Sequence, residues 1–110
     1  MESEMDFDYK VEVTPDTEIA LAKWIEYLVE VKQSIQAADN VLTDYDETLE
    51  RLSTVAASLK LCENDKLAAR GLRKIHFEEH RYILLYYLDG DKAVVTNMFH
   101  ELEDYEEKIK

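Results

Sequence analysis

Residues 82–95 read YILLYYLDGDKAVV, and this stretch identifies the centre of the predicted sheet. From Tyr82 to Leu88 the chain is apolar at every position, which is typical of a central strand covered on both faces. Its tyrosines are therefore expected to fill the core rather than to stack on the bases of a nucleic acid. Asp89-Gly90 is a strong short-range hairpin signal, and a second strand-like run follows it. The stretch predicts two antiparallel strands, 81–88 and 92–100, at the centre of a sheet.

Upstream of this hairpin, the apolar pattern changes to a helical period. Thr14-Pro15-Asp16 has the chemistry of a helix start, and apolar residues recur at helical spacing over residues 15–33. A longer apolar stripe over residues 38–59 follows after a short break. The two predicted helices form an antiparallel hairpin.

Shorter elements complete the predicted topology. Residues 7–13 alternate apolar and polar side chains and predict an edge strand, and residues 72–77 predict a strand beside the central pair. Residues 60–70 are polar and irregular, and 102–109 predict a short acidic helix. The fold class is thus α+β, one domain over residues 1–110. A sheet of about four mostly antiparallel strands packs against the helical hairpin.

Composition places the chain among folded globular proteins. Its 110 residues are 46% hydrophobic and 35% charged, and no apolar run approaches the roughly 20 residues that span a bilayer. The acidic N-terminus lacks the basic segment of a secretory signal. The lone Cys62 fits a reducing compartment and is interpreted as a small buried side chain. We therefore expect a cytoplasmic protein that does not contact a membrane.

The net charge of −12 counts against a protein that binds nucleic acid over its whole surface. The charge is unevenly distributed, because residues 60–81 hold six basic and four acidic residues, a net of +2. The rest of the chain holds seven basic and 21 acidic residues, a net of −14. If the protein binds an anion, this segment is the expected place, although a window of this length is sometimes mildly positive by chance.

The stretch Gly71 to Asp91, continued by Val94-Val95, Phe99-His100 and Asp104-Tyr105, resembles the RelE/ParE family of bacterial toxins. Glu79-His80-Arg81 followed by Leu85-Tyr86 is most similar to the YoeB and plasmid-stabilisation branches. Over residues 7–60 the resemblance rests on the order of elements alone. The chain departs from the family in its acidity, in its long helical hairpin and in the ten residues after His100.

The resemblance implies the toxin of a type II toxin–antitoxin module, neutralised by a cognate antitoxin, with no cofactor or metal. RelE-like members are endoribonucleases that cleave mRNA in the ribosome, whereas ParE-like members inhibit DNA gyrase without chemistry. A third reading is a degenerate member that only binds its antitoxin. The expected function is the first, a growth inhibitor that acts as an mRNA endoribonuclease, and the other two are the alternatives, which the residues alone do not exclude. Whether the chain forms a homodimer is left open.

The resemblance also implies site residues. Arg81 matches the strand arginine of the family, and His100 matches its terminal histidine. Either Arg73 or Lys74 matches a basic residue on the preceding strand, and Tyr105 matches a late tyrosine. An arginine and a histidine of this kind suit RNA cleavage, because arginine stabilises a phosphate in the transition state and histidine passes a proton to the leaving oxygen. The general base is not identified.

Strand register gives an independent expectation. If Asp89-Gly90 is a two-residue loop, Arg81 lies opposite Met98, and His100 shares its face of the sheet. An even-length loop at Glu78-Glu79 adds His76 and Lys74 to that face, whereas one extra loop residue would replace them with Arg73 and Ile75. In the alternative reading, Arg81 pairs with a tail glutamate and His100 merely ends a strand.

Residues 76–80 also match the H-x-x-E-H pattern of one class of zinc proteases. That chemistry needs both histidines on one helix, and these residues lie between two predicted strands. A zinc site is therefore not expected.

Overall fold

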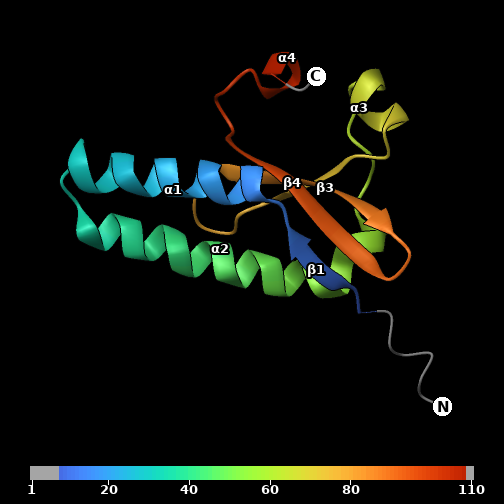
Figure 1. The fold of residues 1–110 in the computed structure, drawn as a ribbon, viewed down its shortest axis with the longest axis horizontal. Coiled ribbons are helices and arrows are strands. Elements are labelled where there is room, and N and C mark those ends of the chain that lie inside the picture. Colours follow the sequence, from blue (N-terminus) through green and yellow to red (C-terminus); the bar gives the residue numbers. More distant parts are fainter. Residues whose placement is uncertain (1–7, 109–110) are drawn as a thin grey trace.

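The computed structural model describes residues 8–108 and confirms the predicted α+β class (Figure 1). The α1–α2 hairpin covers one face of the sheet, here called the helix face, and α3 and α4 lie over the opposite, outer face. Among the described residues, no helix is long and apolar enough to span a membrane. In chain order the elements are β1 (Lys10–Val13), α1 (Pro15–Glu30), α2 (Ile35–Val55), the 3-10 helix η2 (Ala56–Ser58), α3 (Asp65–Ala69), β2 (Arg73–His76), β3 (Tyr82–Asp89), β4 (Lys92–His100) and α4 (Tyr105–Lys108).

The sheet has the strand order β1-β4-β3-β2, so β1 is an edge strand as predicted. It runs parallel to β4, while the other two pairs are antiparallel. The predicted first strand began at Phe7, which lies outside the described residues, as does Ile109 of the predicted tail helix. Helix α3 was not predicted. Asn64 accepts hydrogen bonds from the N–H groups of Lys66 and Leu67 and thereby caps a single helical turn within the polar segment.

Two layers of core residues sandwich β3. Tyr86 and Leu84 point to the helix face and pack with Leu52 of α2, all of them completely buried. Ile83 and Leu85 point to the outer face and pack beneath α3 and α4. The apolar run therefore serves two cores. In the predicted apolar stripe of α2, Leu52 is buried as expected. Leu42 is 36% exposed, because α2 extends beyond the edge of the sheet.

The predicted register between β3 and β4 is wrong in two respects. Asp89 pairs with Lys92, so the loop is Gly90-Asp91, with Gly90 in the left-handed region at φ +62°. Farther along, Leu85 pairs with Asn97 and Tyr86 with Val95, which leaves Thr96 without a partner on β3. Thr96 is therefore the extra residue of a β-bulge. Because side chains alternate along a strand, one inserted residue exchanges the two faces for everything beyond it.

The start of α1 holds this bulge in place. Thr14, the predicted N-cap, donates its backbone N–H to Val95 O (3.0 Å) and its hydroxyl to Thr96 O (3.3 Å). The completely buried Thr17 donates its hydroxyl to Val95 O at 3.2 Å. The bulge carbonyls therefore bond to the first turn of the helix, which also fixes where β1 ends and α1 begins.

We expect Thr17→Val to lower the free energy of unfolding by about 1–2 kcal/mol, because the hydrogen bond to Val95 is lost from a buried site while the side-chain shape is kept. Urea unfolding followed by circular dichroism measures this change. The exposed Thr54 on α2 offers a matched control, and Thr54→Val is expected to change stability by less than about 0.5 kcal/mol. Equal effects of the two substitutions would contradict the role assigned to Thr17.

Candidate functional site

The bulge separates the predicted site residues into two groups. Lys74 and His76 of β2 lie on the outer face, and strand alternation places Arg81, just before β3, on the same face. His100 instead pairs with Tyr82 on the helix face. The predicted opposition of Arg81 to Met98, with His100 beside them, is therefore wrong. Glu101, whose N–H donates to Arg81 O at 2.8 Å, takes the position opposite Arg81 that the predicted register gave to Met98.

Lys74 and Tyr105 contact one another on the outer face. The ammonium of Lys74 donates to the Tyr105 hydroxyl at 3.3 Å and lies 5.9 Å from the centre of its ring. The same ring stacks on Phe99, with centroids 5.6 Å apart. Burial lowers the pKa of Lys74, but the hydrogen bond to Tyr105 and nearby groups outweigh it, so its pKa lies above its ordinary value. Lys74 is thus a persistent cation, suited to bind an anion and unsuited to act as a base.

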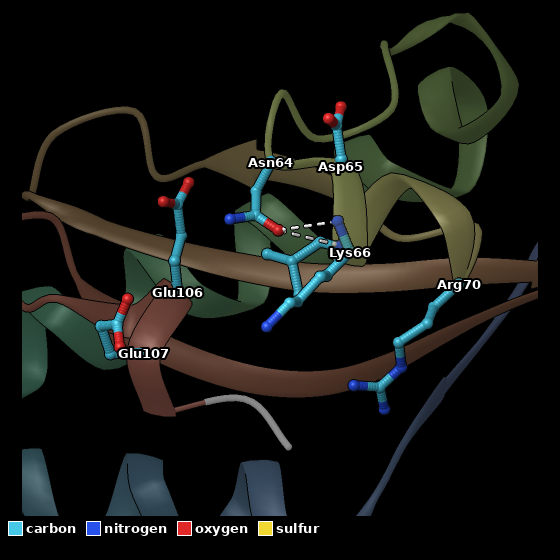
Figure 2. A pocket seen from close by; sticks show the side chains of 7 residues that line it. Asn64, Asp65, Lys66, Arg70, Glu106 and Glu107 are labelled. Carbon is cyan, nitrogen blue, oxygen red and sulfur yellow. Dashed lines mark hydrogen bonds between the residues drawn. The ribbon is translucent and has the colours of Figure 1, made fainter.

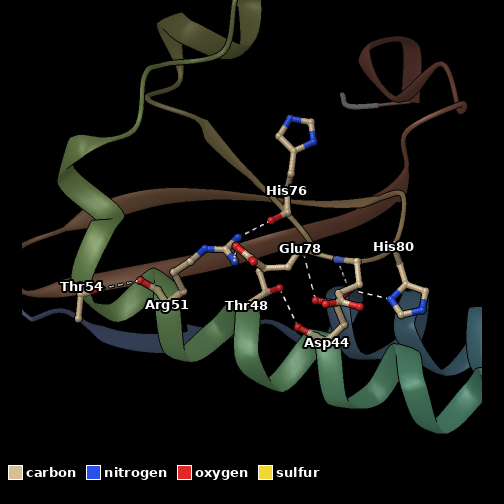
Figure 3. Close-up of polar contacts among 8 residues, drawn as sticks. Asp44, Thr48, Arg51, Thr54, His76, Glu78 and His80 are labelled. Atoms are coloured by element: carbon tan, nitrogen blue, oxygen red, sulfur yellow. Dashed lines mark hydrogen bonds and ion pairs between the residues drawn. The ribbon is translucent and has the colours of Figure 1, made fainter.

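His76 forms a second polar pair on this face. Its ring points away from α2, and Nδ1 lies 3.0 Å from the Glu101 carboxylate (Figure 3). Its backbone carbonyl faces the opposite way and accepts from the guanidinium of Arg51, which also pairs with Glu78. A histidine that touches a carboxylate can hold and transfer a proton. Lys74, Tyr105, His76 and Glu101 therefore form the candidate site.

Arg73 and His100 make different contacts on the helix face. The Arg73 guanidinium donates to the carbonyls of Leu59 and Ala57, the latter at 3.3 Å, and so satisfies backbone oxygens at the end of η2. The His100 ring packs against Trp24 and Tyr82, at 5.7 and 5.3 Å between centroids. Its Nδ1 accepts the Leu102 N–H at 3.1 Å. Both side chains thus take part in packing and backbone contacts.

A polar cluster that the sequence analysis missed fixes the loop between β2 and β3. Asp44 of α2 is 2% exposed and accepts the N–H groups of Glu78 (3.1 Å) and Glu79 (2.9 Å) and Nδ1 of His80 (2.7 Å) (Figure 3). The signal was available, because Asp44 falls on the apolar stripe of its own helix. A carboxylate there needs buried donors.

The Asp44 carboxyl is held in its ionised form. Burial raises its pKa, but the hydrogen bonds from His80 and from the backbone N–H groups of Glu79 and Glu78 lower it more, as does the charge of His80. The pKa of Asp44 therefore lies below its ordinary value.

The two histidines of the H-x-x-E-H pattern contact different carboxylates, His76 that of Glu101 and His80 that of Asp44. The five residues of the pattern lie in a strand and a loop rather than on a helix.

A cleft of about 650 Å³ separates α3 from α4 on the outer face (Figure 2). Lys66 and Arg70 line one side of the cleft, and Glu106 and Glu107 line the other.

Cys62 is buried, as expected, and burial raises the pKa of its thiol, which disfavours the reactive thiolate.

Comparison with known proteins identifies the fold. No family model matches the sequence, and no similar protein is found among curated proteins. Among solved structures, the chain is similar to one from the chromosomal ParDE toxin–antitoxin system of P. aeruginosa, with a TM-score of 0.71 and 16% sequence identity. The match covers 86% of this chain and 97% of that chain. The expected RelE/ParE-like fold is therefore confirmed.

We expect Asp44→Asn to lower the free energy of unfolding by about 2–4 kcal/mol, because an amide NH₂ group would meet buried N–H donors. Asp46→Asn, an exposed change on the same helix, is expected to shift stability by less than about 0.5 kcal/mol. Chemical unfolding at neutral pH measures both.

The effect of Asp44 on stability is also expected to depend on pH. Its folded-state pKa is lowered, so its stabilising contribution is complete above the unfolded pKa of about 3.9 and is lost as the pH falls through the folded-state pKa. The stability difference between the wild type and Asp44→Asn should therefore shrink below about pH 4. A difference that grows on acidification would contradict this assignment.

Proposed function

We propose that the chain is the toxin of a toxin–antitoxin pair and that it inhibits a protein target by binding it. The observation that carries the proposal is the fold, which matches a chain of a ParDE system over nearly the whole length of both proteins. The family resemblance of residues 71–105 supports it independently. By the same resemblance, the proposed target is DNA gyrase.

Two observations favour binding over RNA cleavage. The arginine and histidine expected to cleave RNA, Arg81 and His100, lie on opposite faces of the sheet. The net charge of −12 also repels a polyanion such as RNA from most directions. Neither observation hinders the binding of a protein surface through apolar contacts.

The tip of the α1–α2 hairpin is the proposed contact with the target. Val31 and Ile35 flank the turn between the two helices and are 64% and 69% exposed. Tyr27 and Leu42, farther along the hairpin, are also exposed. Adjacent apolar side chains of this size in solvent are typical of a protein-binding surface. Figure 1 shows this end of the hairpin projecting beyond the sheet, where a large partner can reach it.

An antitoxin is the second proposed partner. It would bury apolar surface of the hairpin or of the sheet edge by adding a helix or a strand. Because this chain is acidic, charge steering of an acidic antitoxin would be weak except at residues 60–81. The association rate with the purified partner should therefore depend little on salt, and a steep fall with added salt would contradict a mainly apolar interface.

RNA cleavage is the alternative function, and one observation favours it. Lys74, His76 and Tyr105 lie together on the exposed outer face, with Arg81 on the same side. There, Lys74 would hold a phosphate and the His76–Glu101 pair would move a proton. Arg81, His100 and Arg73 keep a catalytic role in this candidate only through the family resemblance.

Pulse expression in bacteria separates the two functions. We expect supercoiling of a reporter plasmid to fail before protein synthesis does. Val31→Asp with Ile35→Asp should relieve growth inhibition, because two charges at an apolar contact weaken binding by at least about tenfold. Lys74→Ala with His76→Ala should remain toxic.

Ile19→Asp with Leu61→Asp is the matched control. It makes the same change in charge at two other exposed apolar positions and should remain toxic. If protein synthesis fails first and the Lys74/His76 variant loses toxicity, cleavage replaces binding as the function. Arg81→Ala and His100→Ala, tested in the same assay, then show whether those two residues take part.

A further inference from the structure

The turn between α1 and α2 holds one residue in a backbone conformation that its side chain disfavours. Gln33 has φ +54°, and among residues 8–108 it is the one non-glycine residue with a positive φ. In this left-handed region the Cβ atom lies too close to the following carbonyl oxygen, so glycine is the residue best suited to it. The chain instead carries a long polar side chain here, at an energetic cost that the turn itself does not require.

Hydrogen bonds on both sides of Gln33 hold this conformation. Before it, the N–H groups of the two preceding residues both donate to Tyr27 O, at 2.9 and 3.1 Å. After it, Ser34 donates its N–H to Leu28 O at 3.0 Å, and its hydroxyl accepts the Ala37 N–H at 3.0 Å, which caps α2. The Gln33 side chain therefore starts from a backbone that is fixed in advance of any binding.

The Gln33 side chain takes no part in holding the turn. It is exposed, and its amide has no hydrogen-bond partner among the residues that the structure describes. The neighbouring polar side chains are engaged, because the Lys32 ammonium lies 5.8 Å from the centre of the Tyr27 ring and the Gln36 amide donates to Asn40 Oδ1 at 2.9 Å. Replacing Gln33 by glycine would therefore relieve the backbone without removing an internal contact.

The position of Gln33 sets what a partner must offer. It lies midway in sequence between Val31 and Ile35, the two exposed apolar residues at the end of the hairpin that projects beyond the sheet (Figure 1). An amide within a docked apolar surface loses its water, and a buried amide without hydrogen bonds is unfavourable. A residue in an extended segment satisfies it, because the N–H and C=O of such a residue point to the same side and meet both the acceptor and the donor of the amide.

We propose that Gln33 is the specificity-determining residue of the hairpin tip, and that its amide exchanges two hydrogen bonds with the main chain of an extended segment of the target protein. The inference rests on the proposed function and deepens it, because it names what the target presents. The apolar side chains of Val31 and Ile35 fit many surfaces, whereas a desolvated amide penalises every surface that lacks a matching donor and acceptor. The unfavourable backbone at Gln33 thus serves the partner and not the turn.

The test measures how strongly the full chain inhibits DNA supercoiling by purified DNA gyrase. Gln33→Met keeps the length of the side chain but removes both hydrogen bonds, so it should raise the concentration for half-inhibition at least about tenfold. Gln36→Met is the matched control, because it makes the same chemical change at another exposed position of the hairpin. The control should inhibit gyrase as the wild type does, and an equal loss in the two variants would contradict the proposal.

Gln33→Gly separates the role in binding from the role in folding. This variant should lose inhibition to the same extent as Gln33→Met, because it also lacks the amide. Its thermal unfolding midpoint should equal or exceed that of the wild type, because glycine adopts the left-handed conformation without the steric conflict of a Cβ atom. A side chain that merely supported the turn would instead lower the midpoint when it is removed.

Three further results would overturn the proposal. If Gln33→Met inhibits gyrase as the wild type does while Gln33→Gly does not, the target requires a rigid turn and not the amide. If both variants inhibit normally but Val31→Asp with Ile35→Asp does not, the tip binds by apolar contacts alone, and the proposed function stands without this inference. If the wild type leaves gyrase fully active, gyrase is not the target, and this inference is lost together with the proposed function.

Discussion

The single residue inserted at Thr96 is the constraint on which the arrangement of this molecule depends. It allows β4 to change faces halfway along its length, so that Val95 packs beneath the helices while Glu101 emerges on the outer face. The bulge persists because its carbonyls bond to Thr14 and Thr17 at the start of α1. One local irregularity thus joins the edge strand, the first helix and the outer-face residues.

The two faces of the sheet consequently have different roles. The helix face is a packed core in which polar groups serve the backbone, as Arg73 and Tyr86 do when they donate to the carbonyls around η2. The outer face carries side chains that meet solvent, and Lys74 and His76 there contact Tyr105 and Glu101. Asp44 of α2 connects the helix layer to the sheet, because it holds the loop that leads from the edge strand β2 into the central strand β3.

Charge distribution gives these roles a physical basis. A chain with a net charge of −12 attracts few anions from a distance, so an anionic partner must meet a short-range contact instead. The ammonium of Lys74 on the outer face offers such a contact. The apolar tip of the hairpin lies on the other layer and depends on none of these charges. The protein therefore offers two chemically distinct surfaces, one apolar and one cationic.

Local chemistry along the chain was enough to predict the helix start at Thr14, the strand at 82–88 that is apolar on both faces, the hairpin near Gly90 and the edge position of β1. For Lys74 and His76 it left two registers open, and the pairing of β2 with β3 decided that both residues share the outer face with Arg81. Tertiary structure alone decided the position of His100 and the burial of Asp44. A bulge leaves no reliable mark in a run such as Val94 to Asn97, since it arises from hydrogen bonds to a helix some 80 residues away. The partners of a buried carboxylate are likewise set by the loop that folds onto it.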